Sequence, residues 1–266
     1  MPNTGELRDK QRSIWEAGDL AAFASRITLV SELLCEGVDL RANEKVLDVG
    51  TGTGNTAIAA ARRWCLVTGI DFVPALLDRA RERAKIERCE IELVDGDAED
   101  IPFPDASFDV VLSTFGVMFA LDQRGAASEL LRVCRPGGRI GMTNFPPDSL
   151  AAMFARANSK VSPPPRGVQS PMTWGTERGL KWLFGDGADF SITRRAVRMR
   201  APDAPSAVEF FRTNFGPVRE AFESLEPSDR DELAGLLTDL IAKVNVSGDE
   251  TIVAPWDYVE VVVKRA

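Results

Sequence analysis

The feature that most constrains the fold is a regular alternation of short apolar runs and helix-like segments that begins at Lys45. A short apolar run is typical of a buried strand, and apolar positions spaced by three or four are typical of a helix. Strands that alternate with helices predict an α/β fold with a doubly wound, mostly parallel sheet. The predicted strands lie at Val46–Val49, Leu66–Ile70, Ile91–Val94, Val110–Leu112 and Ile140–Met142, and the predicted helices between them at Asn55–Arg63, Pro74–Ile86 and Gln123–Cys134.

The segments on either side of this alternation have other patterns. Residues 8–37 have the spacing of one or two amphipathic helices, interrupted at Gly18-Asp19, where Asp19 can cap the second. After Asn144 the prolines at 146–147 and 163–165 exclude a buried strand or an uninterrupted helix. Beyond the core we expect helices at Ser149–Asn158 and Glu177–Phe184, and strands at Phe190–Met199 and near Tyr258–Val263.

Because the last predicted strand lies only near residues 258–263, we infer two insertions, residues 146–175 and 203–250. The second insertion is helical and acidic over residues 205–245. We expect both at the carboxyl ends of the strands, where α/β sheets bind ligands. The predicted organisation is an N-terminal helical cover at residues 1–40, a ligand-binding core at 41–145, and the rest of the sheet with a helical cap at 146–266.

The composition excludes several kinds of site. The chain has 32 basic and 40 acidic residues, a net charge of −8, and no histidine. Without histidine there can be no Ser-His or Cys-His nucleophile, and the commonest general base and zinc ligand are missing. The negative charge disfavours a nucleic-acid partner. Arg198 and Arg200, spaced by two, indicate the solvent face of an edge-side strand rather than a nucleic-acid stripe.

The cysteines and the apolar runs bear on the compartment. The four cysteines are scattered without metal-ligand or redox spacing. Residues 1–6 lack the apolar core of a signal peptide, and no apolar run is long enough to span a membrane. We therefore expect a cytoplasmic protein with reduced thiols, no metal site and no membrane partner.

The strongest local signal is the glycine-rich turn Asp48-Val49-Gly50-Thr51-Gly52-Thr53-Gly54. Glycines permit a sharp turn and a close approach of the backbone to a ligand, and the next helix points its first amides at the same place. A nucleotide dehydrogenase would space its glycines as G-x-G-x-x-G, whereas the spacing here is G-x-G-x-G. Asp48 suits a cationic or amine-bearing ligand better than a pyrophosphate. Taken alone, such a loop also fits a structural turn.

Two further clusters follow at the ends of the next strands. Asp71, about twenty residues beyond the loop, can accept hydrogen bonds from both ribose hydroxyls. The alternative is that Asp71 caps the helix that starts near Pro74. The third cluster begins with Gly96-Asp97-Ala98.

With the run Leu131–Arg139, these motifs resemble, in order, those of the class I S-adenosylmethionine-dependent methyltransferases. The nearest branch is similar to the ubiquinone/menaquinone-biosynthesis methyltransferases, and the resemblance covers about residues 40–145. It implies a seven-stranded Rossmann-like sheet, S-adenosylmethionine as the cofactor, and methyl transfer to a small-molecule acceptor.

The resemblance also implies contacts between the motif residues and the cofactor. The methionine and ribose would lie near Asp48, Gly50, Thr51, Gly52 and Asn55, the ribose hydroxyls at Asp71, the adenine at Phe72, Gly96, Asp97 and Ala98, and the sulfonium site at Ser113, Thr114 and Phe115. An N-terminal helix often covers the cofactor in this family, which makes Trp15 and Phe23 candidates. Ordinary core packing is the alternative for these two aromatics.

Methyl transfer from a sulfonium is an in-line displacement, so the enzyme mainly aligns donor and acceptor and excludes water. A thiolate or neutral amine needs no general base, whereas a phenol, hydroxyl or carbon acid usually does. No residue stands out as that base: Tyr258, the single tyrosine, is expected in a strand, and Asp122 fits a helix N-cap equally well. We name no catalytic residue and expect catalysis by proximity.

The acceptor pocket should lie at the strand ends and the insertions, with residues 205–245 as a candidate lid. Abundant apolar side chains there indicate a small, largely hydrophobic acceptor. The candidates for its lining are Met118, Phe119, Phe145, Trp174 and Phe215. The alternative is that several of them belong to the core of the cap.

Three other functions remain as alternatives. The first is a non-catalytic or repurposed protein of the same fold, such as a cyclase or regulatory subunit. The second is a nicotinamide-dependent oxidoreductase, against which the glycine spacing argues. The third is a methyltransferase of macromolecules, which the acidic balance disfavours. The sequence determines neither the acceptor atom nor the oligomeric state, for which a homodimer through the acidic helices is one alternative.

Overall fold

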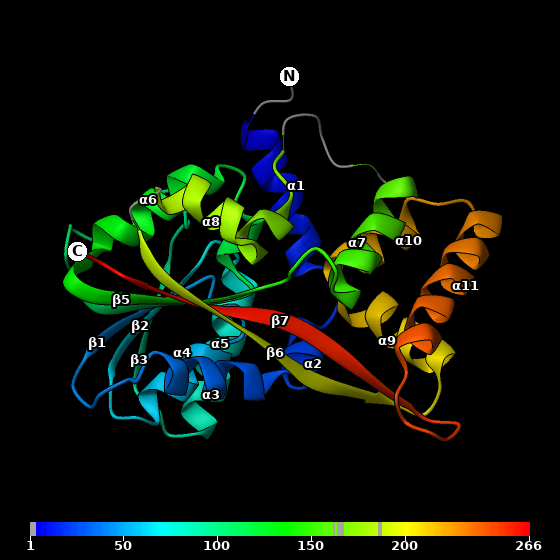
Figure 1. Ribbon diagram of the computed structural model, residues 1–266, viewed down its shortest axis with the longest axis horizontal. Coiled ribbons are helices and arrows are strands. Elements are labelled where there is room, and N and C mark those ends of the chain that lie inside the picture. The colour runs from blue at the N-terminus through cyan, green and yellow to red at the C-terminus, as the bar shows by residue number, and fades with distance from the viewer. Residues whose placement is uncertain (1–3, 162, 164–167, 186–187) are drawn as a thin grey trace. The chain divides into compact units, whose positions relative to one another are not determined.

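The mostly parallel sheet predicted from the alternation is present (Figure 1). The computed structural model describes residues 4–161, 163, 168–185 and 188–266, and within them the strand order is β3-β2-β1-β4-β5-β7-β6. The pairs β1–β2, β1–β4, β2–β3 and β4–β5 are parallel, whereas β7 runs antiparallel to β5. The strands are β1 (Lys45–Val49), β2 (Leu66–Asp71), β3 (Ile91–Asp95), β4 (Phe108–Thr114), β5 (Cys134–Asn144), β6 (Asp189–Ala201) and β7 (Ile252–Lys264). The doubly wound α/β fold is therefore confirmed.

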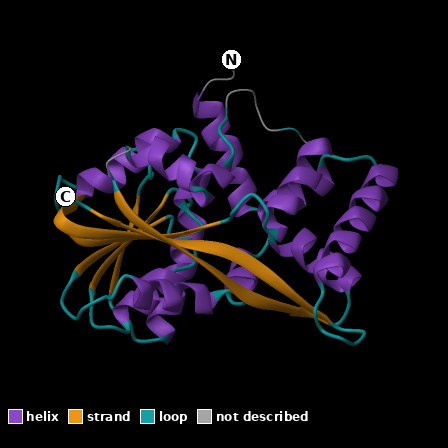
Figure 2. Cartoon of the chain, viewed as in Figure 1, coloured by secondary structure: helices purple, strands orange, loops and turns teal. Residues whose placement is uncertain are grey.

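Helices cover both faces of this sheet (Figure 2). The pair α3 and α4 lies on one face, and the pair α6 and α8 on the other. None of the described helices combines the length and apolar character that crossing a bilayer requires. The helices are α1 (Thr4–Glu16), α2 (Leu20–Ala24), α3 (Thr28–Gly37), α4 (Asn55–Ala61), α5 (Pro74–Ile86), α6 (Gln123–Val133), α7 (Leu150–Val161), α8 (Glu177–Phe184), α9 (Ala204–Asn214), α10 (Gly216–Glu223) and α11 (Pro227–Val244), with short 3₁₀ helices η1 (Val117–Phe119) and η2 (Pro171–Gly175).

The N-terminal segment contains one helix more than predicted. Asp19 caps α2 as expected, because its carboxylate accepts a hydrogen bond from the Ala22 amide at 3.2 Å. A second break separates α2 from α3. There the Ser25 hydroxyl and the Arg26 guanidinium both donate to the Ala22 carbonyl, which competes with the helical backbone pattern. The prediction of one or two helices missed this break, since it depends on side-chain to backbone bonds.

The chain divides into two compact units, which are described separately. The sheet unit comprises residues 27–146, 169–195 and 258–266, and the helical unit comprises residues 1–26, 147–168 and 196–257. Strands β6 and β7 each contribute residues to both units. The three-part division predicted from the sequence, with boundaries at residues 40 and 145, stays a prediction.

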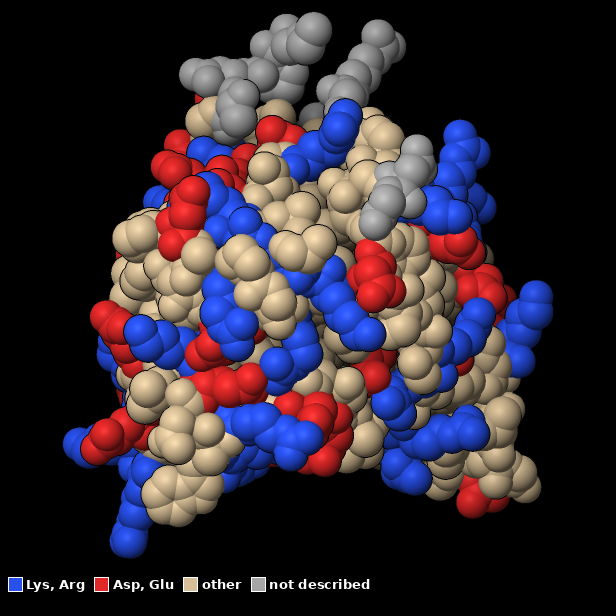
Figure 3. Space-filling model, turned by 60° about the vertical axis from the view of Figure 1, so that its left-hand side comes forward, with Lys and Arg blue, Asp and Glu red and all other residues tan. Residues whose placement is uncertain are grey.

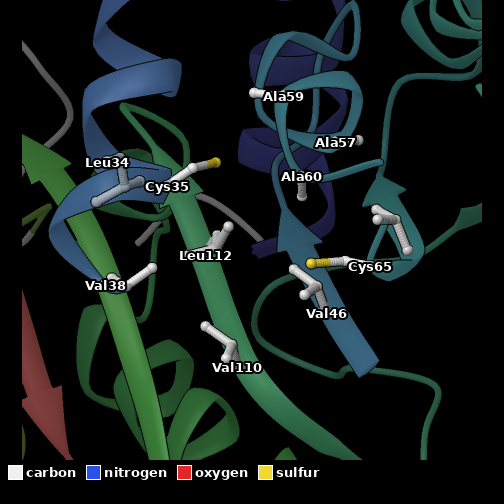
Figure 4. Close-up of a cluster of buried hydrophobic side chains, with 11 residues drawn as sticks. Leu34, Cys35, Val38, Val46, Ala57, Ala59, Ala60, Cys65, Val110 and Leu112 are labelled. Atoms are coloured by element: carbon white, nitrogen blue, oxygen red, sulfur yellow. The ribbon is translucent and has the colours of Figure 1, made fainter. Parts of the chain in front are cut away.

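The core of the sheet unit joins α3 and α4 to the central strands (Figure 4). Leu34 of α3, Val46 of β1 and Leu112 of β4 have no exposed surface. The close approach of α3 depends on Gly141 of β5. A Cβ at that position would lie 2.3 Å from Val38 Cγ1 and 3.0 Å from Leu112 Cδ2. A larger residue would therefore have to displace the helix.

Strand β6 lies at the edge of the sheet, as the arginine spacing predicted. Arg198 and Arg200 are both exposed, whereas Val197, the residue before Arg198, is buried. The alternation of exposed and buried side chains is that of a strand with one solvated face.

We expect Gly141→Ala to lower the free energy of unfolding by about 1–3 kcal/mol, because the added methyl group overpacks the contact between β5 and α3. Urea denaturation followed by circular dichroism measures this change. The matched control is Gly235→Ala in α11, where a Cβ would meet nothing within 4 Å. This control should raise stability by about 0.5–1 kcal/mol, since alanine loses less backbone entropy in a helix. Equal effects of the two substitutions would contradict the packing argument.

Candidate functional site

The loop after β1 has the backbone that its glycines predict. Gly50, Gly52 and Gly54 have φ angles of 67°, 54° and 88°, in the left-handed region that favours glycine. At Gly50 the space is also limited, since a Cβ would lie 3.0 Å from the Cα of Gly116. Gly54 is the N-cap of α4, so the loop delivers the chain directly into the helix. The result is a side-chain-poor turn beside the first amides of a helix.

Asp48, near the end of β1, holds this turn in place through hydrogen bonds. Its Oδ2 accepts hydrogen bonds from the Thr51 hydroxyl at 2.6 Å and from the Ala57 amide at 3.0 Å. Burial raises the pKa of this carboxyl to about 7, and the nearby Asp71 carboxylate adds to the rise. Among the described residues, Oδ1 of Asp48 is buried without a hydrogen-bond partner. One acceptor therefore remains available for a ligand.

Asp71 connects the end of β2 to the same loop. Its Oδ2 accepts a hydrogen bond from the Gly52 amide at 2.8 Å, and its Oδ1 accepts one from the Val73 amide at 3.0 Å. Burial raises the pKa of Asp71 to about 6. The N-cap of α5 is Val73, without a side-chain cap, so the helix-capping alternative for Asp71 does not describe this geometry. Each oxygen keeps lone pairs for further donors.

The third cluster follows β3 and forms a turn beside the second strand. The Gly96 amide donates to the Asp71 carbonyl at 3.2 Å, which brings the two strand ends together. Asp97 Oδ1 accepts from the Glu99 amide at 2.9 Å. Asp97 and Ala98 are both partly exposed, as is Phe72 beyond β2.

At the end of β4 two hydroxyl groups tie that strand to its neighbours. Ser113 Oγ donates to the Val49 carbonyl at 2.7 Å and accepts from the Val117 amide at 2.9 Å. The Thr114 hydroxyl pairs with that of Thr56 on α4 at 2.7 Å. Ser113 therefore fixes the end of β4 to β1, and Thr114 fixes it to α4.

Phe115 follows with a φ of 55°, which is rare for an aromatic residue. Its ring stacks on Phe145, with ring centroids 4.2 Å apart, and meets Tyr258 edge-on at 5.9 Å. Backbone strain of this kind is often found where a side chain must be held in place for function. An aromatic cluster thus forms at the carboxyl ends of β4 and β5.

The remaining predicted residues lie in different surroundings. Trp15 and Phe215 belong to the helical unit, where their rings meet edge-on at 5.9 Å. Phe23 also packs there, against Phe215 at 4.8 Å. In the sheet unit Met118 and Trp174 have no exposed surface. Their predicted contacts with cofactor or acceptor, and those of Phe119, stay predictions.

Two polar residues at this end of the sheet were not among the predicted site residues. The side-chain amide of Asn144, the last residue of β5, is fully buried, and neither of its polar atoms has a partner among the described residues. The hydroxyl of Tyr258 on β7 is likewise buried without a partner, and burial raises its pKa to about 12. Buried polar groups without partners are rare and call for an explanation, of which a ligand is one. The sequence signal that could have identified Asn144 is its place as a polar residue at the carboxyl end of a predicted strand.

Asp122 has a structural role. Its side chain accepts a hydrogen bond from the Gly125 amide at 2.9 Å and caps α6. Of the two readings of Asp122, the helix cap is the one this geometry shows.

Comparison with known proteins gives the family. Residues 47–142 match the methyltransferase domain family. An uncharacterized protein of Mycobacterium tuberculosis is 31% identical over 259 residues, which cover 95% of this chain and 93% of that protein. A demethylmenaquinone methyltransferase of Deinococcus radiodurans is 37% identical over 160 residues, which cover 55% of this chain and 66% of that one. The YcgJ protein of Bacillus subtilis shares the fold, with a TM-score of 0.60 at 20% identity over 89% of this chain and 98% of that chain.

The chain therefore belongs to the class I S-adenosylmethionine-dependent methyltransferases and is related to their menaquinone-biosynthesis branch. Membership of this class implies S-adenosylmethionine as the cofactor. The residues of the loop fit this molecule. The buried, unused acceptor on Asp48 suits a ligand that carries an ammonium group, and the positive φ angles of the three glycines keep the turn free of side chains.

The raised pKa values of Asp48 and Asp71 predict a pH dependence of stability. Between about pH 4 and pH 7 these two carboxyl groups bind more protons in the folded protein than in the unfolded chain, so their contribution to the free energy of unfolding should fall as the pH rises. Asp48→Asn keeps an acceptor for Thr51 and Ala57 but cannot ionise. It should flatten this profile by up to about 4 kcal/mol.

Urea denaturation of the cofactor-free protein at several pH values measures the profile. The exposed Asp78 on α5 provides the control, and Asp78→Asn should leave the profile unchanged. A parent-like pH dependence in Asp48→Asn would show that Asp48 is ionised throughout this range.

Proposed function

We propose that this methyltransferase acts on a small, largely hydrophobic acceptor molecule that carries at least one polar group. The observation that carries the proposal is the cluster at the carboxyl ends of β4 and β5. It combines the stacked rings of Phe115 and Phe145 with Tyr258, which meets Phe115 edge-on and whose buried hydroxyl has no partner among the described residues. Asn144, whose buried side-chain amide also lacks a partner among them, ends β5 at the same edge of the sheet. Small-molecule sites characteristically join an apolar lining to a few polar groups that fix orientation.

The cofactor contacts that we propose follow the strand ends. The methionine and ribose would lie on Gly50, Thr51, Gly52 and Asn55 near Asp48, the ribose hydroxyls on Asp71, the adenine on Phe72, Gly96, Asp97 and Ala98, and the sulfonium beside Ser113, Thr114 and Phe115. Trp15 of the helical unit is proposed as part of the cover. Two hydrogen bonds support these cofactor contacts. The bond from Gly52 to Asp71 joins the loop to the end of β2, and the bond from Ser113 to Val49 joins β4 to β1, so the residues proposed to contact the cofactor are held in fixed positions.

Proximity, rather than acid–base chemistry, is the proposed source of the rate enhancement. When bound, S-adenosylmethionine supplies a methyl group on a sulfonium that needs no further activation. The ionisable residue of the aromatic cluster supports a mechanism of this kind. Burial raises the pKa of Tyr258 to about 12. At neutral pH Tyr258 holds its proton, so it is suited to donate a hydrogen bond to an acceptor rather than to remove its proton.

A small acceptor also agrees with the charge distribution. On the face shown in Figure 3, acidic and basic side chains are interspersed. A nucleic-acid partner would be met by a continuous basic surface. The face shown offers no such surface, and the net charge of −8 agrees with this, so we propose no nucleic-acid substrate.

Calorimetry with S-adenosylmethionine and S-adenosylhomocysteine tests the cofactor contacts. We expect micromolar binding by the parent protein, loss of binding in Gly52→Val, and weakening of about 10- to 100-fold in Asp71→Ala. Gly235→Val and Asp78→Ala are the matched controls, because both residues are exposed on helices, α11 and α5, and neither is among the proposed cofactor contacts. If Asp71→Ala bound as tightly as its control, the proposed ribose contact would be wrong.

Turnover tests the acceptor side. Labelled methyl transfer would be measured against a panel of thiols, amines, phenols and quinones. Absence of product with every acceptor, despite tight cofactor binding, would favour a repurposed protein of the same fold.

With any acceptor that reacts, Tyr258→Phe should lower kcat/KM by about tenfold, because one hydrogen bond to the acceptor is lost. The same substitution should preserve the free energy of unfolding or raise it by about 1 kcal/mol, since the hydroxyl is buried without a partner. Calorimetry of the cofactor serves as the control and should be unaffected. Unchanged kcat/KM would remove Tyr258 from the acceptor site.

A further inference from the structure

The helical unit contains a pocket of about 440 Å³ that none of the roles above uses. Its walls come from the segment after α2, from α7, β6, α9 and α11, and from the first half of β7. All of its lining residues belong to the helical unit, and none of them is acidic. The volume lies within the range of ordinary small-molecule sites.

The floor of this pocket is apolar. Leu150, Phe211 and Ile241, from three different helices, line it and are almost completely buried. Ile252 and Ala254 of β7 complete the floor. Such a surface offers burial for a hydrocarbon or aromatic body.

Three arginines surround this floor: Arg26, Arg198 and Arg200. The Arg26 guanidinium lies 3.9 Å from the centre of the Phe210 ring and donates to the Ala22 carbonyl. Arg200 donates to the Arg198 carbonyl at 3.1 Å. Among the described residues, no carboxylate forms an ion pair with any of the three. An aromatic ring and a carbonyl thus hold the Arg26 guanidinium, a carbonyl holds that of Arg200, and no described carboxylate neutralises any of the three charges.

This arrangement differs from that of two neighbouring arginines, one on β6 and one on α9. The protein has more acidic than basic residues, and neighbouring arginines of the same elements are paired, Arg195 with Glu260 and Arg212 with Glu209. Asp203 is the acidic residue nearest in sequence to Arg200. It is the N-cap of α9, where its side chain accepts a hydrogen bond from the Ser206 amide at 2.7 Å. Three unpaired guanidinium groups on an apolar pocket are complementary to an anion with an apolar body.

We infer that this pocket binds a carboxylic acid with an apolar body, whose carboxylate pairs with Arg198, Arg200 or Arg26 and whose hydrocarbon part lies on the floor formed by Phe211 and Ile241. None of the pocket residues has a proposed role at the cofactor. The inference is therefore independent of the acceptor proposed above.

Calorimetry on the full chain with four twelve-carbon probes tests the inference. Dodecanoate should bind at one site, at least about tenfold more tightly than dodecan-1-ol or dodecylammonium, because only the carboxylate pairs with the arginines. Raising the salt concentration should weaken the binding. Dodecyl phosphate distinguishes the head groups. Equal or weaker binding than dodecanoate supports a carboxylate site, whereas binding of the phosphate alone overturns it.

Two variants locate the probe. The double variant Arg198→Gln/Arg200→Gln should weaken dodecanoate binding by about tenfold or more. Its matched control, Arg79→Gln/Arg178→Gln, makes the same change in net charge at exposed positions of α5 and α8 and should leave binding unchanged. Ser206→Phe places a ring in the pocket without changing the charge and should also reduce binding.

Affinity for S-adenosylhomocysteine, measured on the same samples, should be that of the parent, which shows that the variants are folded. Retention of dodecanoate binding in both pocket variants, equal loss in the charge control, or equal affinity for the alcohol would each overturn the inference.

Discussion

The buried carboxylate of Asp48 connects three elements that must keep fixed positions for the cofactor site to exist. It belongs to β1, accepts from Thr51 inside the glycine loop, and accepts from Ala57 in the first turn of α4. Asp71 repeats the arrangement from the neighbouring strand by accepting from Gly52. Because the glycines themselves carry no side chains, the loop has few other means of holding its shape. The two carboxylates supply the contacts that glycine cannot.

This arrangement has an electrostatic cost that a ligand can relieve. Both carboxyl groups have raised pKa values because burial disfavours their charged forms. The Asp71 carboxylate adds to the rise at Asp48, and the Asp95 carboxylate adds to the rise at Asp71. A ligand with a positive charge and several donors stabilises the ionised forms. The raised pKa values of the two carboxyl groups and the suitability of the loop for a cationic ligand thus have the same origin.

The strands and helices of residues 45–144 could be predicted because their signals are local. Apolar runs, the prolines and glycines at helix ends, and the G-x-G-x-G spacing need no knowledge of distant residues. Helix α5 has the predicted bounds, and so does α8 beyond this range. Asn144 and Tyr258 could not be recognised in this way. Their backbones come to the same edge of the sheet only because β7 pairs with β5, with Asn144 opposite Val259, the residue after Tyr258. The sequence also did not reveal that Arg26, Arg198 and Arg200 line one pocket. Arginines spaced by two are expected both on the solvated face of a strand and at the edge of a pocket, so their spacing does not distinguish the two.

The order of the strands also has a consequence during synthesis. In the sheet, β7 lies between β5 and β6, yet it is the last of the three to leave the ribosome. Until then β5 has an open edge, and β6 has no neighbour to join. Open strand edges invite pairing with other nascent chains, and charged side chains are a common protection against it. The exposed arginines of β6, Arg194, Arg198 and Arg200, would keep this waiting strand from pairing with the wrong partner while the chain is incomplete.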